Sequence, residues 1–340
     1  MKPLVSILVP AYNAQNWIAA TLRSALEQTW DHKEIIIVND GSRDQTLAIA
    51  RQFESKEVRV VTQENQGAAA ARNKCLLLSQ GQYIQWLDAD DLLGPDKISL
   101  QMQAGGLTNR TLLSAEWAPF LFRHRRARFV PTALWCDLSP VEWLLRKMER
   151  NLYMQTATWL VSRELTEAAG PWDTHLLGDD DGEYFCRVLL ASSGVHFVPG
   201  AKVYYRQAGA GSLSYIGRSG RKMVAQWRSM ESHIAYIRSL EDSDRVRAAC
   251  LKYLQNWLFF FFPDRPDLVA KVQTMAAALG GRLEEPTLSW KYLWIRALFG
   301  WNLAKRAQVA LPAARWAMVR SWDRTMFRIE NGVLARSQAT

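Results

Sequence analysis

The chain has 340 residues, enough for one large domain or for a domain with an appendage. With 49% hydrophobic and 22% charged residues, it has the composition of an ordinary globular protein rather than of a disordered one. Four widely spaced cysteines without a C-x-x-C pair argue against a disulfide framework or a zinc site. The formal net charge of +9 favours anionic partners, such as nucleotide phosphates, nucleic acid or an acidic membrane surface.

Strand-like and helix-like segments alternate over the first 90 residues. Apolar runs predict strands at residues 4–9, 34–40, 58–61 and 83–88, and helical spacing predicts helices at 15–30, 44–53 and 67–79. Strands that alternate with helices indicate an α/β fold with a mostly parallel sheet flanked by helices.

The pattern loosens after residue 91. We expect strands and loops over 112–135, strands at 159–162 and 195–205, and helices at 139–150, at 179–191 and from about 215 onward. The change in pattern places a soft boundary near residue 212. It predicts a first domain over 1–212 and a helical C-terminal extension over 213–340.

Polar clusters follow three of the predicted strands, at Pro10–Asn13, Asn39–Ser42 and Asp88–Asp91. Ligands of doubly wound sheets bind at the carboxyl ends of the strands, so these clusters should meet at one edge. Alternation along an extended chain turns Asp88 and Asp90 to the same side, where two carboxylates suit Mg²⁺ or Mn²⁺. The alternative is a solvated acidic turn or a helix N-cap.

Asp40 and Arg72 could each bind a ligand or have a purely structural role. Asp40 can accept hydrogen bonds from a base N–H, or it can cap the turn that follows it. Arg72, on the alanine-rich helix, can reach a nucleotide or lie at the surface of a tightly packed helix.

Four segments occur in a specific order: VSILVPAYN (5–13), IIIVNDGSRDQT (35–46), ENQGAAAARN (64–73) and YIQWLDADD (83–91). Together they resemble the family 2 glycosyltransferases of the GT-A fold, over roughly residues 3–210. The resemblance implies a site for a nucleotide-diphosphate sugar. The residues that it places against the nucleotide or the metal ion are Pro10, Ala11, Tyr12 and Asp40 at a base that is usually uracil, Arg72 as a further base contact, Asp88 near the ribose and metal, and Asp90 on Mn²⁺ or Mg²⁺.

The family also has an acidic motif at the start of a later helix. Its match is Asp180-Asp181-Gly-Glu-Tyr-Phe-Cys-Arg187, and the spacing to Arg187 aligns Asp181 with the catalytic base. Asp180 and Asp179 leave a one-residue ambiguity, and stabilisation of a helix N-terminus is the structural alternative. Crowded carboxylates raise one another's pKa values, which helps a base near neutral pH. One base and no nucleophile imply a single displacement with inversion.

Three other positions bear on the site. Trp172, just upstream, can stack on an acceptor sugar or be a packed aromatic residue. Family members often carry a histidine that helps to ligate the metal or phosphate where this chain has Ala208, next to a glycine-rich loop over 209–214 that could close over the donor. Cys75 replaces a usual glycine, which we interpret as a change in packing.

The C-terminal third interleaves tryptophans with lysines and arginines. Basic amphipathic helices with tryptophan suit an anionic membrane interface, where a lipid-linked acceptor would lie. The alternative is a helical appendage that packs on the catalytic domain or on a second subunit. Nucleic-acid binding is disfavoured, because the basic residues are dispersed and no known module is present. The reduced cysteines and the absence of a signal pattern predict a cytoplasmic protein, or one peripheral at the inner face of the membrane.

These predictions converge on an inverting glycosyltransferase of the hexosyltransferase type. It would transfer a sugar, with a UDP-sugar the preferred donor, to a hydroxyl group of a saccharide or lipid-linked acceptor in cell-surface polysaccharide or glycolipid synthesis. The alternatives are a catalytically weak nucleotide-sugar-binding scaffold and a sugar-nucleotide pyrophosphorylase. The second usually has a glycine-rich loop after the first strand, which Pro10–Asn13 is not.

Overall fold

The computed structural model describes residues 2–104, 108–207 and 219–337. The chain divides into two compact units. Unit 1 is Met1–Pro119 with Arg128–Cys250, and unit 2 is Phe120–Ala127 with Leu251–Thr340.

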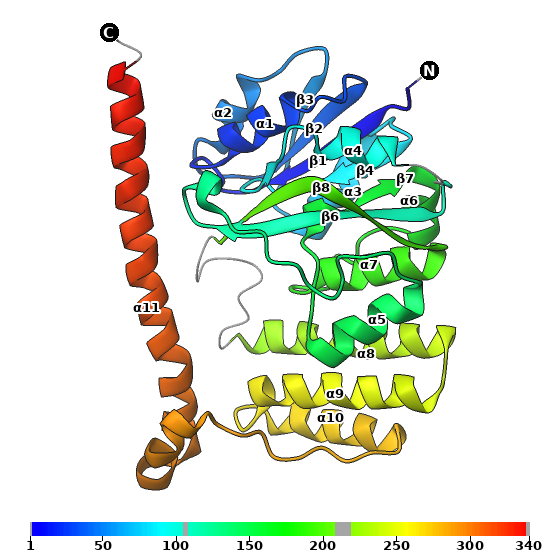
Figure 1. Cartoon of the computed structure of the whole chain (residues 1–340), viewed down its shortest axis with the longest axis vertical. Coiled ribbons are helices and arrows are strands. Elements are labelled where there is room, and N and C mark those ends of the chain that lie inside the picture. Colours follow the sequence, from blue (N-terminus) through cyan, green and yellow to red (C-terminus); the bar gives the residue numbers. More distant parts are fainter. Residues whose placement is uncertain (1, 105–107, 208–218, 338–340) are drawn as a thin grey trace. The chain divides into compact units, whose positions relative to one another are not determined.

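Unit 1 is built on one mixed sheet, drawn as arrows in Figure 1. In the described part of the chain its strands follow the order β3-β2-β1-β4-β7-β6-β8-β5. The first four in the chain pair with one another in parallel: β1 (Val5–Ala11), β2 (Lys33–Asp40), β3 (Val58–Gln63) and β4 (Tyr83–Trp86). The others add antiparallel pairings: β5 (Leu92–Leu93), β6 (Thr111–Phe120), β7 (Leu160–Ser162) and β8 (Gly194–Arg206). The predicted mostly parallel α/β sheet is confirmed.

Helices flank this sheet. Those before α9 are α1 (Ile18–Leu26), α2 (Thr46–Arg51), α3 (Ala68–Leu78), α4 (Lys97–Gln103), α5 (Pro140–Arg150), α6 (Arg163–Ala169), α7 (Asp180–Ala191) and α8 (Gly220–Leu240). Helix α3 packs on β1 and β2, and its small buried residues Ala69 and Ala71 allow a close approach. The apolar run of β2 from Ile35 to Val38 is buried on both faces of the sheet, as expected of a central parallel strand.

Unit 1 continues past the boundary predicted near residue 212. Helix α8 packs on α7 and α5, and its residues Trp227, Met230 and Ile237 are buried. Because this apolar face is covered within unit 1, the compact unit extends to Cys250, inside α9 (Asp244–Phe261).

Unit 2 combines a short stretch from the middle of the chain with the C-terminal region. Its helices include α10 (Pro266–Ala278) and α11 (Leu293–Ser337), and Gly300, with φ of 80°, interrupts the helical geometry of α11. Residues 120–127, which include the short 3-10 turn His124–Arg126, are bound to α11. Arg123 forms ion pairs with Asp323 at 2.7 Å and Glu330 at 3.0 Å. Within the described residues, no helix combines the length and the apolar character that a membrane span requires.

Candidate active site

The carboxyl ends of β1, β2 and β4 lie at one edge of the sheet. The parallel register pairs Ala11 with Asn39 and Leu8 with Trp86. The residues that follow each strand, including Tyr12, Asp40 and Asp88, therefore start from the same edge, which is the convergence predicted from the sequence.

The loop after β1 is tied to the loop after β2. The backbone N–H of Asn13 donates to Ser42 Oγ at 3.0 Å, and Asn13 Oδ1 accepts from the N–H of Arg43 at 2.9 Å. Ala11 is buried, whereas the neighbouring Tyr12 side chain is 48% exposed. Tyr12 is therefore the residue of Pro10–Tyr12 with the largest open surface for a planar ligand.

Asp40 holds together the turn between β3 and α3. Its Oδ1 accepts from Gln63 Nε2 at 2.8 Å and from the N–H of Gln66 at 2.9 Å. Its Oδ2 accepts from the N–H of Gly67 at 2.9 Å and from Asn65 Nδ2 at 3.1 Å. A carboxylate has about four acceptor positions, so all of them are filled. The predicted contact with a base N–H would have to displace one of these donors. The donors come from the turn between β3 and α3, and not from the turn directly after Asp40 that the structural alternative named.

The glycine after Asp40 is required by this turn. Gly41 has a φ of +67°, and a Cβ there would lie 2.8 Å from the backbone nitrogen of Asn65. Any other residue would be strained by its backbone and would collide with the loop that Asp40 anchors.

Arg72 joins the two acidic motifs of the site. Its Nη2 lies 2.8 Å from Asp88 Oδ1, and its Nη1 lies 2.7 Å from Asp180 Oδ2. Burial opposes the charge of this guanidinium, but the carboxylates of Asp88 and Asp180 raise the pKa of Arg72 above its ordinary value. Both terminal nitrogens are engaged by carboxylates, so Arg72 bridges the turn after β4 and the start of α7. Its role as a base contact stays a prediction.

Trp172 is a packed residue rather than a sugar platform. Its side chain is 1% exposed. One face stacks on Tyr184 at 4.1 Å between ring centroids, and the Arg72 guanidinium lies 4.4 Å from the ring centroid. The predicted stacking on an acceptor sugar therefore has no open face in this structure, because the indole supports the buried Arg72 instead.

The Asp88–Asp91 turn concentrates negative charge at the end of β4. Burial and the neighbouring Asp88 raise the pKa of Asp90 to about 7. Asp91, fully buried, accepts from the N–H of Arg206 at 2.7 Å and from Gln155 Nε2, while Arg206 Nε donates to the carbonyl of Asp90 at 2.8 Å. These bonds fix the turn from both flanks.

The donor set of this turn fits a hard divalent cation. Asp88 and Asp90 offer carboxylate oxygens, the ligands that Mg²⁺ and Mn²⁺ prefer, and their mutual repulsion is relieved by a cation. The described residues contain no cluster of three His, Cys, Asp or Glu able to hold a metal. An ion held here would complete its coordination with water and with phosphate oxygens of a substrate.

The three consecutive aspartates at the start of α7 have three different surroundings. Asp179, with φ of 54°, accepts from Ser229 Oγ at 2.5 Å and Gln226 Nε2 at 3.2 Å, and a Cβ on Gly182 would collide with its carboxylate. Asp180 is paired with Arg72. Asp181 accepts only from the N–H of Gly182 at 2.9 Å and from Thr156 Oγ1 at 3.3 Å, among the hydrogen bonds of the described residues.

The charges around Asp181 differ from those around Asp180. Burial and the charge of Asp179 raise the pKa of Asp181, and burial raises that of Asp180 to about 6 against the opposing charge of Arg72. The described residues supply no cation within salt-bridge distance of Asp181. Of the three carboxylates, only Asp180 is paired with a cation among the described residues, whereas Asp179 and Asp181 are held by neutral donors.

Several residues of the site carry no motif that sequence reasoning could use. From the loop after α5, Gln155 donates to Asp91 and Thr156 donates to Asp181. Asp91 is fully buried, so its carboxylate holds the turn in place from inside the fold. Ala208 and the glycine-rich stretch 209–214 lie outside the described residues. Cys75 is fully buried against the strands, in keeping with a packing role.

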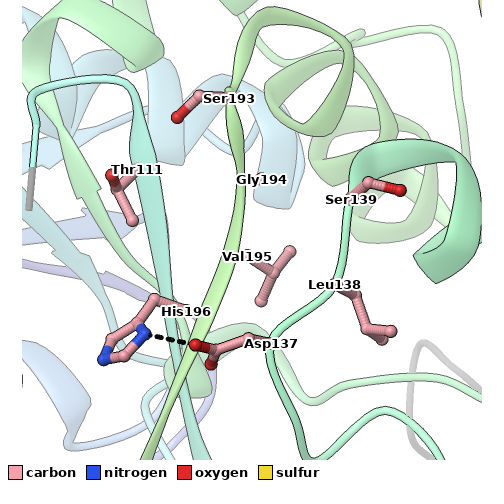
Figure 2. Close-up of a pocket in the computed structure, with 8 residues that line it drawn as sticks. All are labelled: Thr111, Asp137, Leu138, Ser139, Ser193, Gly194, Val195 and His196. Carbon is pink, nitrogen blue, oxygen red and sulfur yellow. Dashed lines mark hydrogen bonds and ion pairs between the residues drawn. The ribbon is translucent and has the colours of Figure 1, made fainter.

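A separate hollow of about 390 Å³ lies elsewhere in unit 1. Figure 2 shows two of its lining residues, Asp137 and His196, bonded to each other, with the imidazole Nδ1 2.8 Å from the carboxylate. None of the carboxylates described above lines it, so it is distinct from the candidate active site.

Comparisons with known proteins agree with this geometry. Residues 6–105 match the family described as Glycosyl transferase family 2. The putative teichuronic acid biosynthesis glycosyltransferase TuaG of Bacillus subtilis (strain 168) is 46% identical over 105 residues, which cover 30% of this chain and 42% of that protein. Chondroitin synthase of Escherichia coli is 43% identical over 100 residues, 29% of this chain and 15% of that protein. The chain thus spans less than half the length of these curated relatives.

Solved structures extend the likeness beyond the matched segment. S. aureus TarS 1–349 in complex with UDP-GlcNAc has a TM-score of 0.65 at 17% identity, over 82% of this chain and 81% of that one. The mannosyltransferase PcManGT from Pyrobaculum calidifontis, in complex with GDP-Man and Mn²⁺, has a TM-score of 0.53 at 19% identity, over 95% and 85%. At these identities the likeness shows the fold alone. Over residues 6–105 the chain is therefore similar to glycosyl transferase family 2, within a GT-A-like fold.

Proposed function

We propose that the protein is an inverting glycosyltransferase that transfers a sugar from a nucleotide-diphosphate sugar to a hydroxyl acceptor. The observation that carries this proposal is the Arg72 bridge. Its two ion pairs connect Asp88, in the turn after β4, to Asp180 at the start of α7. The next residue, Asp181, has no cation within salt-bridge distance among the described residues. The same domain thus brings a diphosphate-binding turn and a base together, as the transfer reaction requires.

The chemistry follows from these positions. Asp181 accepts the proton of the acceptor hydroxyl as its oxygen forms a bond to the anomeric carbon. The bond from that carbon to the nucleotide diphosphate breaks on the opposite face, and its electron pair leaves with the diphosphate. Asp88 and Asp90 would hold Mn²⁺ or Mg²⁺, whose charge stabilises the departing diphosphate when the ion is bound. A single displacement inverts the anomeric configuration.

The donor and the biological role rest on relatives rather than on geometry. The TarS structure contains UDP-GlcNAc and the mannosyltransferase contains GDP-Man, so the fold accommodates either nucleotide. We favour a UDP-sugar because the motifs resemble those that usually hold uracil. A role in cell-surface polysaccharide or glycolipid synthesis is supported by the teichuronic acid relative.

A screen of nucleotide sugars tests the proposal. UDP-, GDP- and dTDP-sugars are incubated with the protein and Mn²⁺ or Mg²⁺, and release of nucleotide diphosphate is measured with and without simple sugar acceptors. We expect metal-dependent release from one nucleotide class, increased by an acceptor. Binding of a nucleotide sugar without release or transfer would instead support the scaffold alternative, and release of sugar 1-phosphate on addition of pyrophosphate would support a pyrophosphorylase.

We further propose that unit 2 contacts an anionic membrane surface. Large apolar side chains of the segment 290–299 are highly exposed: Trp290 at 76%, Trp294 at 59%, Leu298 at 70% and Phe299 at 62%. Lys291 and Arg296 lie among them. Tryptophan prefers the headgroup region of a bilayer, and basic side chains are attracted to anionic lipids.

A further inference from the structure

A cluster of three aromatic residues in unit 1 includes Tyr153, which lies three residues before the Thr156 that bonds to Asp181. Trp117 on β6 is 5.1 Å from Tyr153 and 6.0 Å from Tyr205, measured between ring centroids. The Trp117 and Tyr153 planes are inclined by 39°, so they form a continuous tilted surface rather than a closed stack. Tyr153 is 52% exposed, whereas Trp117 and Tyr205 are half-buried. The tyrosine ring is thus supported from behind and open in front.

The backbone that carries Tyr153 is fixed at both ends. Before it, Asn151 ends α5 with φ of 51°, and the N–H of Leu152 donates to the carbonyl of Lys147 at 3.0 Å. After it, Gln155 bonds to the buried Asp91 beside the metal-binding turn. A surface tyrosine on such a fixed backbone loses little conformational entropy when a ligand covers it.

The same segment reaches the base. Thr156, three residues after Tyr153, donates from Oγ1 to Asp181 Oδ2 at 3.3 Å. Partial burial, and then the negative charge of Asp181, raise the pKa of Tyr153, which agrees with their proximity. Tyr153 therefore lies on the side of Asp181 that comes from the loop after α5, whereas Arg72 and Asp88 reach the aspartate cluster from α3 and β4.

We propose that Tyr153, supported by Trp117, is the acceptor platform: it binds a pyranose ring of the acceptor and holds its hydroxyl toward Asp181. A pyranose has one face of C–H groups that covers an aromatic ring, and hydroxyls at its edge that need polar partners. The Tyr153 ring offers a surface for the C–H face, and the Asp181 carboxylate offers a polar partner for a hydroxyl. The inference rests on the proposed transferase function and assigns the half of the reaction that the donor motifs leave open.

The test separates acceptor binding from donor binding. With the donor found in the screen, KM is measured for the donor and for a panel of methyl glycosides, in the wild type, Tyr153→Ala and Tyr153→Phe. We expect Tyr153→Ala to raise the acceptor KM about tenfold and the donor KM much less, with Tyr153→Phe recovering most of the loss. Leu77→Ala, a change at a side chain 76% exposed on α3, is the matched surface control and should move neither constant.

Saturation-transfer NMR of the methyl glycosides with protein and UDP gives a readout without turnover. The signal should fall in Tyr153→Ala and persist in Tyr153→Phe. Equal acceptor KM values in the wild type and Tyr153→Ala, or an equal rise in the donor KM, would overturn the platform while leaving the transferase function intact. Octyl glycosides test the other possible apolar contact, a lipid tail. If Tyr153→Ala weakens binding of octyl glycosides but not of methyl glycosides, Tyr153 binds a lipid tail and not a sugar ring. A wild type that neither hydrolyses nor transfers would overturn both proposals.

Discussion

Arg72 is the residue on which the geometry of the site depends most. A guanidinium can bridge two carboxylates because its donors form a planar fork, whereas an ammonium is a single point of charge. Without this cation, the half-buried carboxylates of Asp88 and Asp180 would be left without their counter-ion. The stacked Trp172 beneath it adds to the stability of the ion pairs and keeps water away from one side.

We expect Arg72→Met to destabilise the fold by about 3–5 kcal/mol, the usual cost of breaking a buried ion pair, and to abolish transfer. Arg72→Lys should restore part of the stability but little activity, because it cannot hold both carboxylates. Thermal unfolding and transfer rates measure the two effects. Wild-type activity in Arg72→Lys would show that the bridge is not needed for catalysis.

Asp181→Asn should retain donor binding and lose transfer by about 10²–10⁴-fold, the contribution of a general base. The amide oxygen can still accept from the N–H of Gly182, and the amide NH2 can donate to Thr156 Oγ1, so the local structure should persist. Calorimetry with the donor and a transfer assay provide the comparison, and Thr156→Val is a milder control that alters only one contact of the base. If Asp181→Asn transfers sugar as fast as the wild type, the base has been assigned to the wrong aspartate.

The pH dependence of transfer should reflect the surroundings of Asp181. Burial and Asp179 raise the pKa of Asp181, Asp88 adds to this, and Arg72 opposes it. A base acts when deprotonated, so kcat/KM should be full above the raised pKa and fall as the pH drops through it, at a higher pH than for an exposed aspartate. Asp179→Asn removes one raising charge, and the acid limb should move to lower pH. A limb that moves to higher pH would contradict this account.

At the scale of elements, the strand ends explain which parts of the fold could be predicted. β1, β2 and β4 are largely apolar strands followed by polar residues. This pattern is local, so the parallel sheet and the shared edge at the strand ends could both be predicted. The helices α4 and α6 and the two-residue β5 were not predicted, because each is short and depends on tertiary contacts. The domain boundary near 212 stays a prediction. The compact unit extends to Cys250 because α8 packs on α7 and α5, and such contacts leave no local pattern in the sequence.

The site residues divide in the same way. The metal-binding turn and the acidic motif were identified by residue type and order. The partners of Asp40, Arg72 and Trp172 come from segments distant in sequence, and no spacing rule indicates that the acceptor positions of Asp40 are filled or that Trp172 is covered. Tyr153 carried no signal, because a lone tyrosine in a loop is common and only its exposure beside Asp181 distinguishes it.

The turn after β4 makes a prediction of its own. Because Asp88 and Asp90 supply two ligands and the diphosphate the rest, nucleotide sugar should bind only weakly in a chelator and regain affinity with Mn²⁺ or Mg²⁺. Calorimetry in both conditions measures this. Asp90→Asn should reduce the difference, and equal affinity with and without chelator would remove the metal from the proposal.

At the scale of the whole molecule, the exposed aromatic segment 290–299 predicts binding to lipid. Sedimentation with vesicles should show binding to phosphatidylcholine mixed with phosphatidylglycerol, weaker binding to phosphatidylcholine alone, and a decline with added salt. Trp290→Ser with Trp294→Ser should reduce binding, whereas Leu77→Ser, at a side chain as exposed as Trp290, should not. Loss of self-association in the tryptophan variant, with vesicle binding unchanged, would instead make this segment a subunit contact.

The pairing of residues 120–127 with α11 has a consequence for biosynthesis. Arg123 and Asp323 are 200 positions apart. At about 5–20 residues per second, roughly 10–40 s of translation separate the appearance of Arg123 from that of its partner. Until then Phe122, which is 8% exposed in the finished protein, lacks the Phe327 ring that lies 6.1 Å from it. The nascent chain therefore emerges with an exposed apolar and cationic loop until α11 is made, and in this interval it is most prone to aggregate.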